Sequence, residues 1–220
     1  MEWTLTFIGT VLDFDARDSK AINYRLAQAT KVFYKWRHIL QCRLVPVSVR
    51  AKLTTTTVFQ ALLWLSETWH PTVEEVKRLN SWGARIFARV AGIRPKVDDA
   101  EGDFWRRMHR FGHGLMTASG GNVDTFRRRR LHSFAGHIAR ATGSVANVAL
   151  HTRSLAWWRA FQGRQLLKHP RRFYPWRWEE QLTSHYGEEA SFFIDEAVGW
   201  MRKAQNRSTW KELESAFGES

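Results

Sequence analysis

Residues 61–93, ALLWLSETWHPTVEEVKRLNSWGARIFARVAGI, predict a corner between two helices. Pro71 has no backbone N–H to donate and moves the residue before it out of the helical conformation, so the first helix ends there. Thr72 and Glu75 are three residues apart, which is the spacing of a capping box at the start of a second helix. Apolar side chains then recur at helical intervals as far as Gly92, a residue type that commonly ends a helix. The apolar positions of this second helix are Val73, Val76, Leu79, Ile86, Phe87 and Val90.

The rest of the sequence predicts a mostly α fold, a helical bundle with a short N-terminal β-hairpin. Trp3, Leu5 and Phe7 alternate with threonines in the pattern of a strand that reaches residue 8, and residues 11–14 can form the returning strand. A single hairpin is marginal in water, so we expect it to pack on another part of the protein.

Helical spacing covers most of the remaining chain. A stripe of apolar residues predicts a helix from Asp18 or Ser19 onward, and its members are Ile22, Leu26, Ala29, Phe33, Trp36 and Leu40. Residues 46–65 also show helical spacing, although four threonines at 54–57 disfavour a helix because β-branched side chains lose rotamers there. Further helices are predicted at 104–116, 124–143, 145–168, 193–204 and 209–217.

The loop RPKVDDAEGD, at residues 94–103, separates two predicted domains, 1–93 and 104–220. The second is expected to be a basic helical region that ends in acidic helices. Residues 104–140 carry eight basic and one acidic side chain, and residues 151–178 carry seven basic and no acidic ones. Residues 179–220 carry four basic and nine acidic side chains.

The whole chain of 220 residues has a formal net charge of +13. Such an excess favours a polyanionic partner, either nucleic acid or an anionic membrane surface, with a solvated basic surface as the alternative. Because the excess is concentrated in the middle of the chain, as in a nucleic-acid footprint, we expect nucleic acid and no membrane.

The single cysteine, Cys42, excludes an internal disulfide and a thiolate metal cluster, so a reducing, intracellular compartment is expected, nuclear or cytoplasmic. No run of about twenty apolar residues exists. The N-terminus lacks the features of a signal peptide. It begins abruptly in a predicted strand, as a fragment boundary would.

The histidines and carboxylates give weak signals for catalysis or metal binding. His109 and His113 would share a helix face, but neither a carboxylate nor a cysteine is nearby as a third ligand. Asp13, Asp15 and Asp18 lack the glycine and the distal glutamate of a calcium loop, and acids that favour a turn explain them better. Glycine patterns for a phosphate-binding loop or a nucleophile elbow are absent. We therefore predict no catalytic residue and no metal ligand.

Two basic segments are the principal candidates for binding nucleic acid. The first is a block of four arginines at the start of a helix, where a phosphate partner would offset the unfavourable helix dipole. The second, at residues 169–178, is predicted to be a loop in which arginines alternate with aromatic rings that can stack on bases, or else a loop folded onto the core. The predicted nucleic-acid-binding residues are Arg127, Arg128, Arg129, Arg130, Arg140, Arg171, Arg172, Trp176, Arg177, Lys31 and Lys35. A solvated helix face is the alternative for the two lysines.

Several short segments form an ordered set along the chain. They are Phe7, Ile8 and Gly9; Lys20, Ile22, Arg25, Leu26, Ala29 and Phe33; LLWLSETW at 62–69; KRLN at 77–80 with Arg85, Arg89, Gly92 and Ile93; residues 128–131 with Phe134, Gly136, His137, Ile138 and Arg140; and NRSTW at 206–210. This set resembles the region that follows the palm domain in reverse transcriptases of non-LTR (LINE-like) retrotransposons. The resemblance covers most of residues 1–142 and, more weakly, the rest.

The resemblance implies a primer-grip-like strand at Phe7, Ile8 and Gly9, a helical thumb that holds template–primer nucleic acid, and a connector. It implies RNA, an RNA–DNA hybrid or DNA as partner, together with a palm domain. The family's metal-binding carboxylates belong to a [FY]xDD turn before the first segment, and this sequence does not contain that turn. Without them nucleotidyl transfer has no charge clamp, so we expect no polymerase activity from this chain alone and Mg²⁺ only in a complete polymerase.

The sequence is thus interpreted as a fragment of an RNA-directed DNA polymerase that binds template–primer nucleic acid through its backbone. One alternative is a stand-alone basic helical protein that binds nucleic acid. Another is a helical interaction module whose basic face meets an acidic protein.

Overall fold

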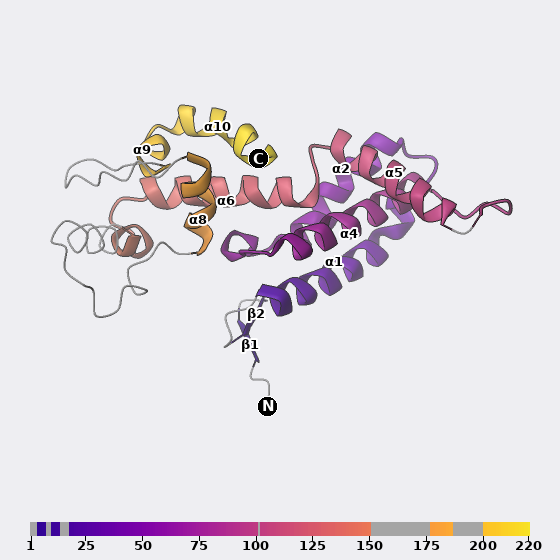
Figure 1. Cartoon of the computed structure of the whole chain (residues 1–220), viewed down its shortest axis with the longest axis horizontal. Helices are drawn as coiled ribbons and strands as arrows, with labels where there is room; N and C mark the ends of the chain where they lie inside the picture. The colour runs from indigo at the N-terminus through magenta and orange to yellow at the C-terminus, as the bar shows by residue number, and fades with distance from the viewer. Residues whose placement is uncertain (1–3, 8–9, 14–17, 101, 151–176, 187–199) are drawn as a thin grey trace. The chain divides into compact units, whose positions relative to one another are not determined.

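The computed structural model describes the chain apart from residues 1–3, 8–9, 14–17, 101, 151–176 and 187–199. This described part is mostly helical, as the sequence predicts (Figure 1). It divides into two compact units, each with its own apolar core: unit 1, Met1–Arg127, and unit 2, Arg128–Ser220. In the described ranges, no helix combines the length and apolar character that crossing a membrane requires.

Unit 1 begins with two short strands, β1 (Thr4–Phe7) and β2 (Thr10–Asp13), which pair antiparallel with Phe7 opposite Thr10. Its helical segments are α1 (Asp18–Leu40), α2 (Val47–Thr54), η1 (Thr55–Phe59), α3 (Gln60–Leu62), η2 (Ser66–Thr68), α4 (Val73–Ala91), α5 (Asp103–Ala118) and the start of α6 (Val123–Arg140). Unit 1 extends past the loop at residues 94–103 because α5 packs along α4. A functional division at that loop stays a prediction.

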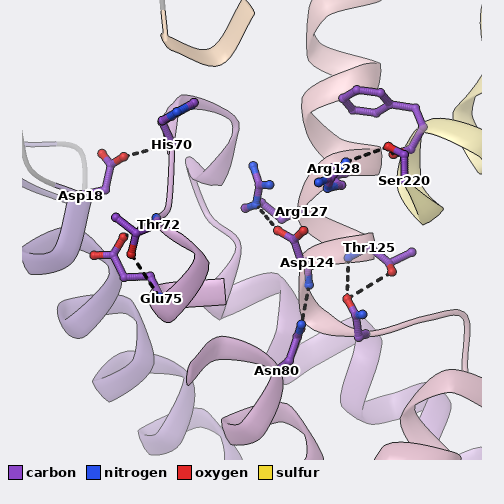
Figure 2. A network of polar contacts seen from close by, with 12 residues as sticks. Asp18, His70, Thr72, Glu75, Asn80, Asp124, Thr125, Arg127, Arg128 and Ser220 are labelled. Atoms are coloured by element: carbon purple, nitrogen blue, oxygen red, sulfur yellow. Dashed lines mark hydrogen bonds and ion pairs between the residues drawn. The ribbon is translucent and has the colours of Figure 1, made fainter. Parts of the chain in front are cut away.

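The predicted corner before α4 is present, and Figure 2 shows the capping box at the start of α4. The Thr72 hydroxyl accepts a hydrogen bond from the Glu75 N–H (3.3 Å), and the Glu75 carboxylate accepts one from the Thr72 N–H (2.8 Å). α4 ends at Gly92, whose φ of 80° is in the left-handed region that glycine adopts without a Cβ penalty. The Asp18 carboxylate accepts a hydrogen bond from the His70 N–H (2.6 Å), which joins the corner to the start of α1.

The segment predicted as one helix at residues 46–65 is irregular, which corrects the prediction. α2 passes into η1, a π-helical turn, and the chain then turns at Leu65, which has a φ of 62°. The four threonines explain this change, because hydroxyls that bind nearby backbone carbonyls compete with regular helical hydrogen bonds. The hydroxyl donors and carbonyl acceptors are Thr54 and Arg50 (2.8 Å), Thr55 and Lys52 (2.8 Å), Thr56 and Lys52 (3.1 Å), and Thr57 and Leu53 (2.6 Å).

α1 and α4 run side by side and parallel (Figure 1). Three hydrogen-bonded side-chain pairs cross the seam between them in the same order along both helices: Asn23 with Arg78, Thr30 with Trp82, and Tyr34 with Arg89. Because the helices are parallel, their C-terminal ends, which carry the negative ends of the helix dipoles, lie together. The buried guanidinium of Arg50 donates there to the carbonyls of Leu40 and Val90 and stabilises both ends.

Aromatic rings fill the core of unit 1 around Phe59, whose ring centre is 5.5 Å from those of Phe87 and Phe126. Five of the six apolar positions predicted on α1 are buried, but Trp36 is 40% exposed. Val73, predicted for the apolar face of α4, is 65% exposed. Both predictions were wrong. Val73 is the first residue of α4, where fewer neighbouring segments cover a side chain, but this reason does not apply to Trp36, because Leu40 lies closer to the end of α1 and is buried.

α5 approaches α4 closely where both helices have a glycine. A Cβ on Gly112 would lie 1.9 Å from the carbonyl oxygen of Ala84, and a Cβ on Gly83 would lie 2.8 Å from the sulfur of Met116 on α5. A residue without a side chain is needed for backbones to approach so closely. Gly112 therefore permits the contact that adds α5 to unit 1.

Unit 2 contains the rest of α6, a helical stretch at residues 145–150, α8 (Arg177–Tyr186), α9 (Trp200–Gln205) and α10 (Arg207–Glu219). Of the helices predicted at 145–168 and 193–204, only residues 145–150 and 200–204 are described, and both stretches are helical. The helix predicted at 209–217 corresponds to α10.

The core of unit 2 includes His132, which is 1% exposed. Its ring stacks on that of Trp210 with 3.8 Å between centres, and its Nε2 shares a hydrogen bond of 2.9 Å with the Tyr186 hydroxyl. Burial lowers the pKa of His132 to about 4 and raises the pKa of Tyr186 to about 12. Both side chains are therefore neutral core groups near neutral pH.

Candidate nucleic-acid interface

The first arginine of the predicted block is part of the protein interior (Figure 2). Arg127 is 2% exposed, and its Nε donates to the Asp124 carboxylate at 2.6 Å. The Asp124 N–H in turn donates to the side-chain oxygen of Asn80 on α4 (3.1 Å). Arg127 thus stabilises the start of α6 within unit 1.

The next two arginines hold the end of α10 in unit 2. Arg128 Nη1 donates to the Ser220 hydroxyl (2.8 Å), and Arg129 Nη2 lies 3.6 Å from the Glu219 carboxylate. A Cβ on Gly218 would lie 2.9 Å from Arg129 Cγ, so this glycine lets α10 approach the arginine stem. Both guanidinium groups thus have partners within the chain.

Arg130 and Arg140 complete the arginines predicted on α6, and both are partly buried. Arg140 Nη1 donates to the carbonyl of Ala204 (2.5 Å). Four consecutive helical residues point around a whole turn, and residues 127–130 accordingly do not gather on one exposed surface. Their role in binding nucleic acid stays a prediction.

The two lysines predicted on α1 are exposed. Lys35 Nζ lies 5.7 Å from the ring centre of Trp36, which is a cation–π distance. The surroundings of Lys31 and Lys35 are therefore open to a ligand.

The remaining predicted residues are less completely described. Phe7 is the last residue of β1, and Arg177 is the first residue of α8. The predicted loop at 169–178 is thus corrected at its end, because its last two residues are helical. Outside the described residues lie Ile8, Gly9, Arg171, Arg172 and Trp176.

α4 presents three exposed arginines, Arg78, Arg85 and Arg89, which we call the α4 row. Spacings of seven and four residues place them on one face of the helix. Arg89 donates to the Tyr34 hydroxyl (3.3 Å) and Arg78 to the side-chain oxygen of Asn23, so the α4 row follows the seam with α1. Arg85 makes no hydrogen bond or ion pair to the described part of the chain.

Little negative charge offsets the α4 row. Residues 19–66 contain no Asp or Glu, and the two acids of α4, Glu74 and Glu75, are in its first turn. Lys31 and Lys35 are exposed on α1, about a quarter of a helix turn from the residues that bond across the seam, and they add positive charge to this side of unit 1. A face that carries only positive charge raises the local concentration of a polyanion.

The length of the α4 row suits a phosphate backbone. With a rise of 1.5 Å per residue, the three arginines span about 16 Å along the helix axis. Phosphates of one strand advance about 3.4 Å each along a duplex axis, so the α4 row matches the length of about five phosphates. Guanidinium groups donate paired hydrogen bonds to phosphate oxygens and keep their charge at all relevant pH values.

The α4 row is not among the nucleic-acid-binding residues that the sequence predicts, although its three arginines belong to the motif of residues 77–93. The signal was available in the spacing, since three arginines recur on the polar face of a helix with a strong apolar face. The contiguous arginines at 127–130 were more conspicuous, although only the spaced arginines share a face.

Among the described residues, no group of three or more His, Cys, Asp or Glu side chains is placed to hold a metal ion. The rings of His109 and His113 on α5 are 5.9 Å apart, but structural and catalytic zinc sites need three or four protein ligands. Asp18, the last of the three acids at residues 13–18, accepts the hydrogen bond from the His70 N–H.

Comparison with known proteins gives no further assignment: no protein-family model matches the chain, and neither a curated protein nor a solved structure matches it significantly.

Proposed function

We propose that this chain binds nucleic acid through the sugar–phosphate backbone, with the α1–α4 seam as the contact surface. In this proposal it acts as the thumb and connector of a non-LTR retrotransposon reverse transcriptase, and it positions template–primer nucleic acid for a palm domain.

The observation that carries the proposal is the α4 row, three exposed arginines on one helix face with no acid beyond the first turn of α4. Lys31 and Lys35 extend the positive charge onto α1. The mostly helical frame and the parallel pairing of α1 and α4 support a rigid surface, because the buried Arg50 and the hydrogen bond between Trp82 and Thr30, neither of which belongs to the α4 row, join one helix to the other.

Backbone recognition is favoured over recognition of bases. Arginine and lysine side chains on a helix surface contact phosphates without regard to sequence, and such contacts release counterions. Affinity is therefore expected to depend strongly on salt and weakly on the order of the bases.

The first experiment is a salt titration of binding to a fluorescent RNA–DNA hybrid of about sixteen base pairs. We expect the logarithm of the affinity to fall linearly with the logarithm of salt, with a slope of about −0.9 for each phosphate contacted. Absence of binding at low salt, with a folded protein, would refute the proposal.

The second experiment assigns the binding to the seam. The variant R78Q/R85Q/R89Q should lose about tenfold or more in affinity at 0.1 M salt, and its salt slope should decrease by about two to three. The matched control R43Q/K52Q/R94Q removes three exposed charges of unit 1 outside the seam and should retain more of the affinity and slope. Equal losses in the two variants would mean that net charge, not the α4 row, determines binding.

An acidic protein partner is the rival proposal, because it would use the same charges. Competition by polyglutamate with the same net charge as the RNA–DNA hybrid distinguishes an acidic protein partner from nucleic acid. If nucleic acid binds through phosphates on the α4 row, polyglutamate should compete weakly, whereas equal competition would favour the acidic partner.

Catalysis is not assigned to any residue of this chain. Primer extension with Mg²⁺ and an RNA template should give no product, and any nucleotide addition by the purified chain would contradict the proposed division between binding and chemistry.

A further inference from the structure

The outer face of α5 presents a second group of basic side chains in unit 1. Arg106, His109, Arg110 and His113 recur at intervals of three, one and three residues, so they share one side of the helix, and all four are exposed. An adjoining side of the helix packs on α4 through buried residues that include Gly112, next to Ala84, and Met116, next to Gly83. These four residues, the α5 row, are therefore not needed for the core.

The charges around the α5 row are mostly positive. On α5 itself the acid is Asp103, which pairs with Arg106 at 2.5 Å where both side chains are largely exposed. Such a surface pair contributes little and exchanges readily with another anion. The loop before α5 has three further acids in its sequence, Asp98, Asp99 and Glu101. Of these, Asp99 is held by Arg107 in a two-bonded ion pair, which lowers the pKa of Asp99 to about 2.

The α4 surface against α5 adds no carboxylate. Its closest approach is at Ala84, beside the exposed Arg85, and the acids of α4 are confined to the first turn. His113 Nδ1 lies 3.4 Å from the Thr117 hydroxyl, a neutral group. The loop before α5 contributes Lys96 and Asp98, which are both exposed.

A metal cation does not suit this face. Two imidazoles supply fewer ligands than zinc sites use, and the guanidinium groups of Arg106 and Arg110 repel a cation. A phosphate suits all four side chains, because two are permanent cations and two become cations when they take up a proton.

We propose that the α5 row is a second phosphate-binding surface that makes nucleic-acid binding tighter as the pH falls. This inference rests on the proposed function, because it assigns further contacts and a regulation to the same ligand. A phosphate near His109 or His113 favours the protonated imidazole, so binding takes up protons and affinity increases toward lower pH. Arg106 and Arg110 contribute at every pH.

The test measures the affinity of the full chain for the RNA–DNA hybrid at pH 5.8 and at pH 8.0. The wild-type protein should bind about threefold to tenfold more tightly at the lower pH, as expected for one or two added phosphate contacts. H109Q/H113Q should lose most of this difference while its affinity at pH 8.0 stays within about twofold of the wild type. H137Q, which removes an exposed histidine of unit 2, is the matched control and should keep the difference.

R106Q/R110Q should weaken binding at both pH values and decrease the salt slope by about one to two. A full pH effect in H109Q/H113Q, or an unchanged slope in R106Q/R110Q, would overturn the inference. If these variants behave as the wild type while R78Q/R85Q/R89Q binds weakly, the proposed function stands and the inference fails. If R78Q/R85Q/R89Q also binds as the wild type, the proposed function itself fails.

Discussion

The α4 row and the arginine block at residues 127–130 contain the same side chain in opposite surroundings. The α4 row lies on one exposed helix face that has no acid beyond its first turn. In the block, Arg127 is buried against Asp124, and the two arginines that follow are bonded to the end of α10. An exposed arginine with few partners can bind phosphate at little cost, whereas a buried one must first give up a contact that stabilises the fold.

This difference predicts that substitutions in the two regions act on different quantities. Changes in the block or in the packing beneath the exposed rows should lower the free energy of unfolding. Changes in the α4 row should lower affinity and leave the fold intact.

The largest effect is expected at the glycine that joins α5 to α4. Gly112→Val places a side chain where a Cβ would already lie 1.9 Å from the Ala84 carbonyl oxygen, so the helices must separate. We expect a loss of at least about 3 kcal/mol in the free energy of unfolding, measured in urea. Gly114→Ala is the control, because it has open space around it, and it should be neutral or stabilise by up to about 1 kcal/mol. Equal stability of the two variants would show that α5 does not pack as described.

Breaking the ion pair inside the block should have the next largest effect. Arg127→Met leaves the Asp124 carboxylate buried without this partner and should cost about 3 kcal/mol. The same change at the exposed Arg85 should alter stability by less than about 0.5 kcal/mol. Adding Asp124→Asn to Arg127→Met should recover part of the loss. If Arg127→Met and Arg85→Met unfold at the same urea concentration, the contrast between the block and the α4 row is wrong.

A smaller effect, confined to unit 2, concerns pH. Burial, together with the positive charges of His185 and Arg140, lowers the pKa of His132 to about 4, below the ordinary value of about 6.5. Between these values the unfolded chain binds more protons than the folded protein, so stability is complete above pH 6.5 and decreases as the pH falls toward 4. After allowance for solvent screening, the loss is on the order of 2 kcal/mol.

Urea unfolding at pH 7.5 and 4.5, followed by tryptophan fluorescence, measures this loss. His132→Phe keeps a ring beside Trp210 and removes the titrating group, so its stability should change less between the two pH values, whatever its stability at neutral pH. An equally steep pH dependence in this variant would assign the effect to other groups.

The sequence predicts the local structure well where short-range chemistry decides it. Thr72, Glu75 and Gly92 mark the ends of α4 because each acts through bonds or dihedral angles within a few residues. The π-helical turn is caused by four threonines that can be seen in the sequence. That the helix becomes π-helical there depends on how the threonine hydroxyls compete with backbone N–H groups for the carbonyls, which the sequence does not show.

The distribution of partners among the arginines could not be predicted from the sequence, because it depends on contacts between distant residues. Ser220 is 92 positions from Arg128, and the Asn80 side chain is 44 positions from the Asp124 N–H that it binds. A run of four arginines in the sequence shows that the segment is positively charged. Whether an arginine is buried, as Arg127 is, or exposed, as Arg85 is, depends on which helices pack on it. The shared helix face of Arg78, Arg85 and Arg89 is the part of the candidate site that can be predicted from the sequence, because it follows from their spacing.

The most direct test compares R78Q/R85Q/R89Q with R128Q/R129Q/R130Q, three arginines each, in binding the RNA–DNA hybrid over a range of salt concentrations. We expect the α4-row variant to lose about tenfold or more in affinity at 0.1 M salt, and its slope to decrease by about two to three, with the stability of the wild type. The block variant should retain affinity within about threefold and unfold more easily. A block variant that loses its affinity and slope while the α4-row variant binds as the wild type would contradict the assignment of the α1–α4 seam as the nucleic-acid interface.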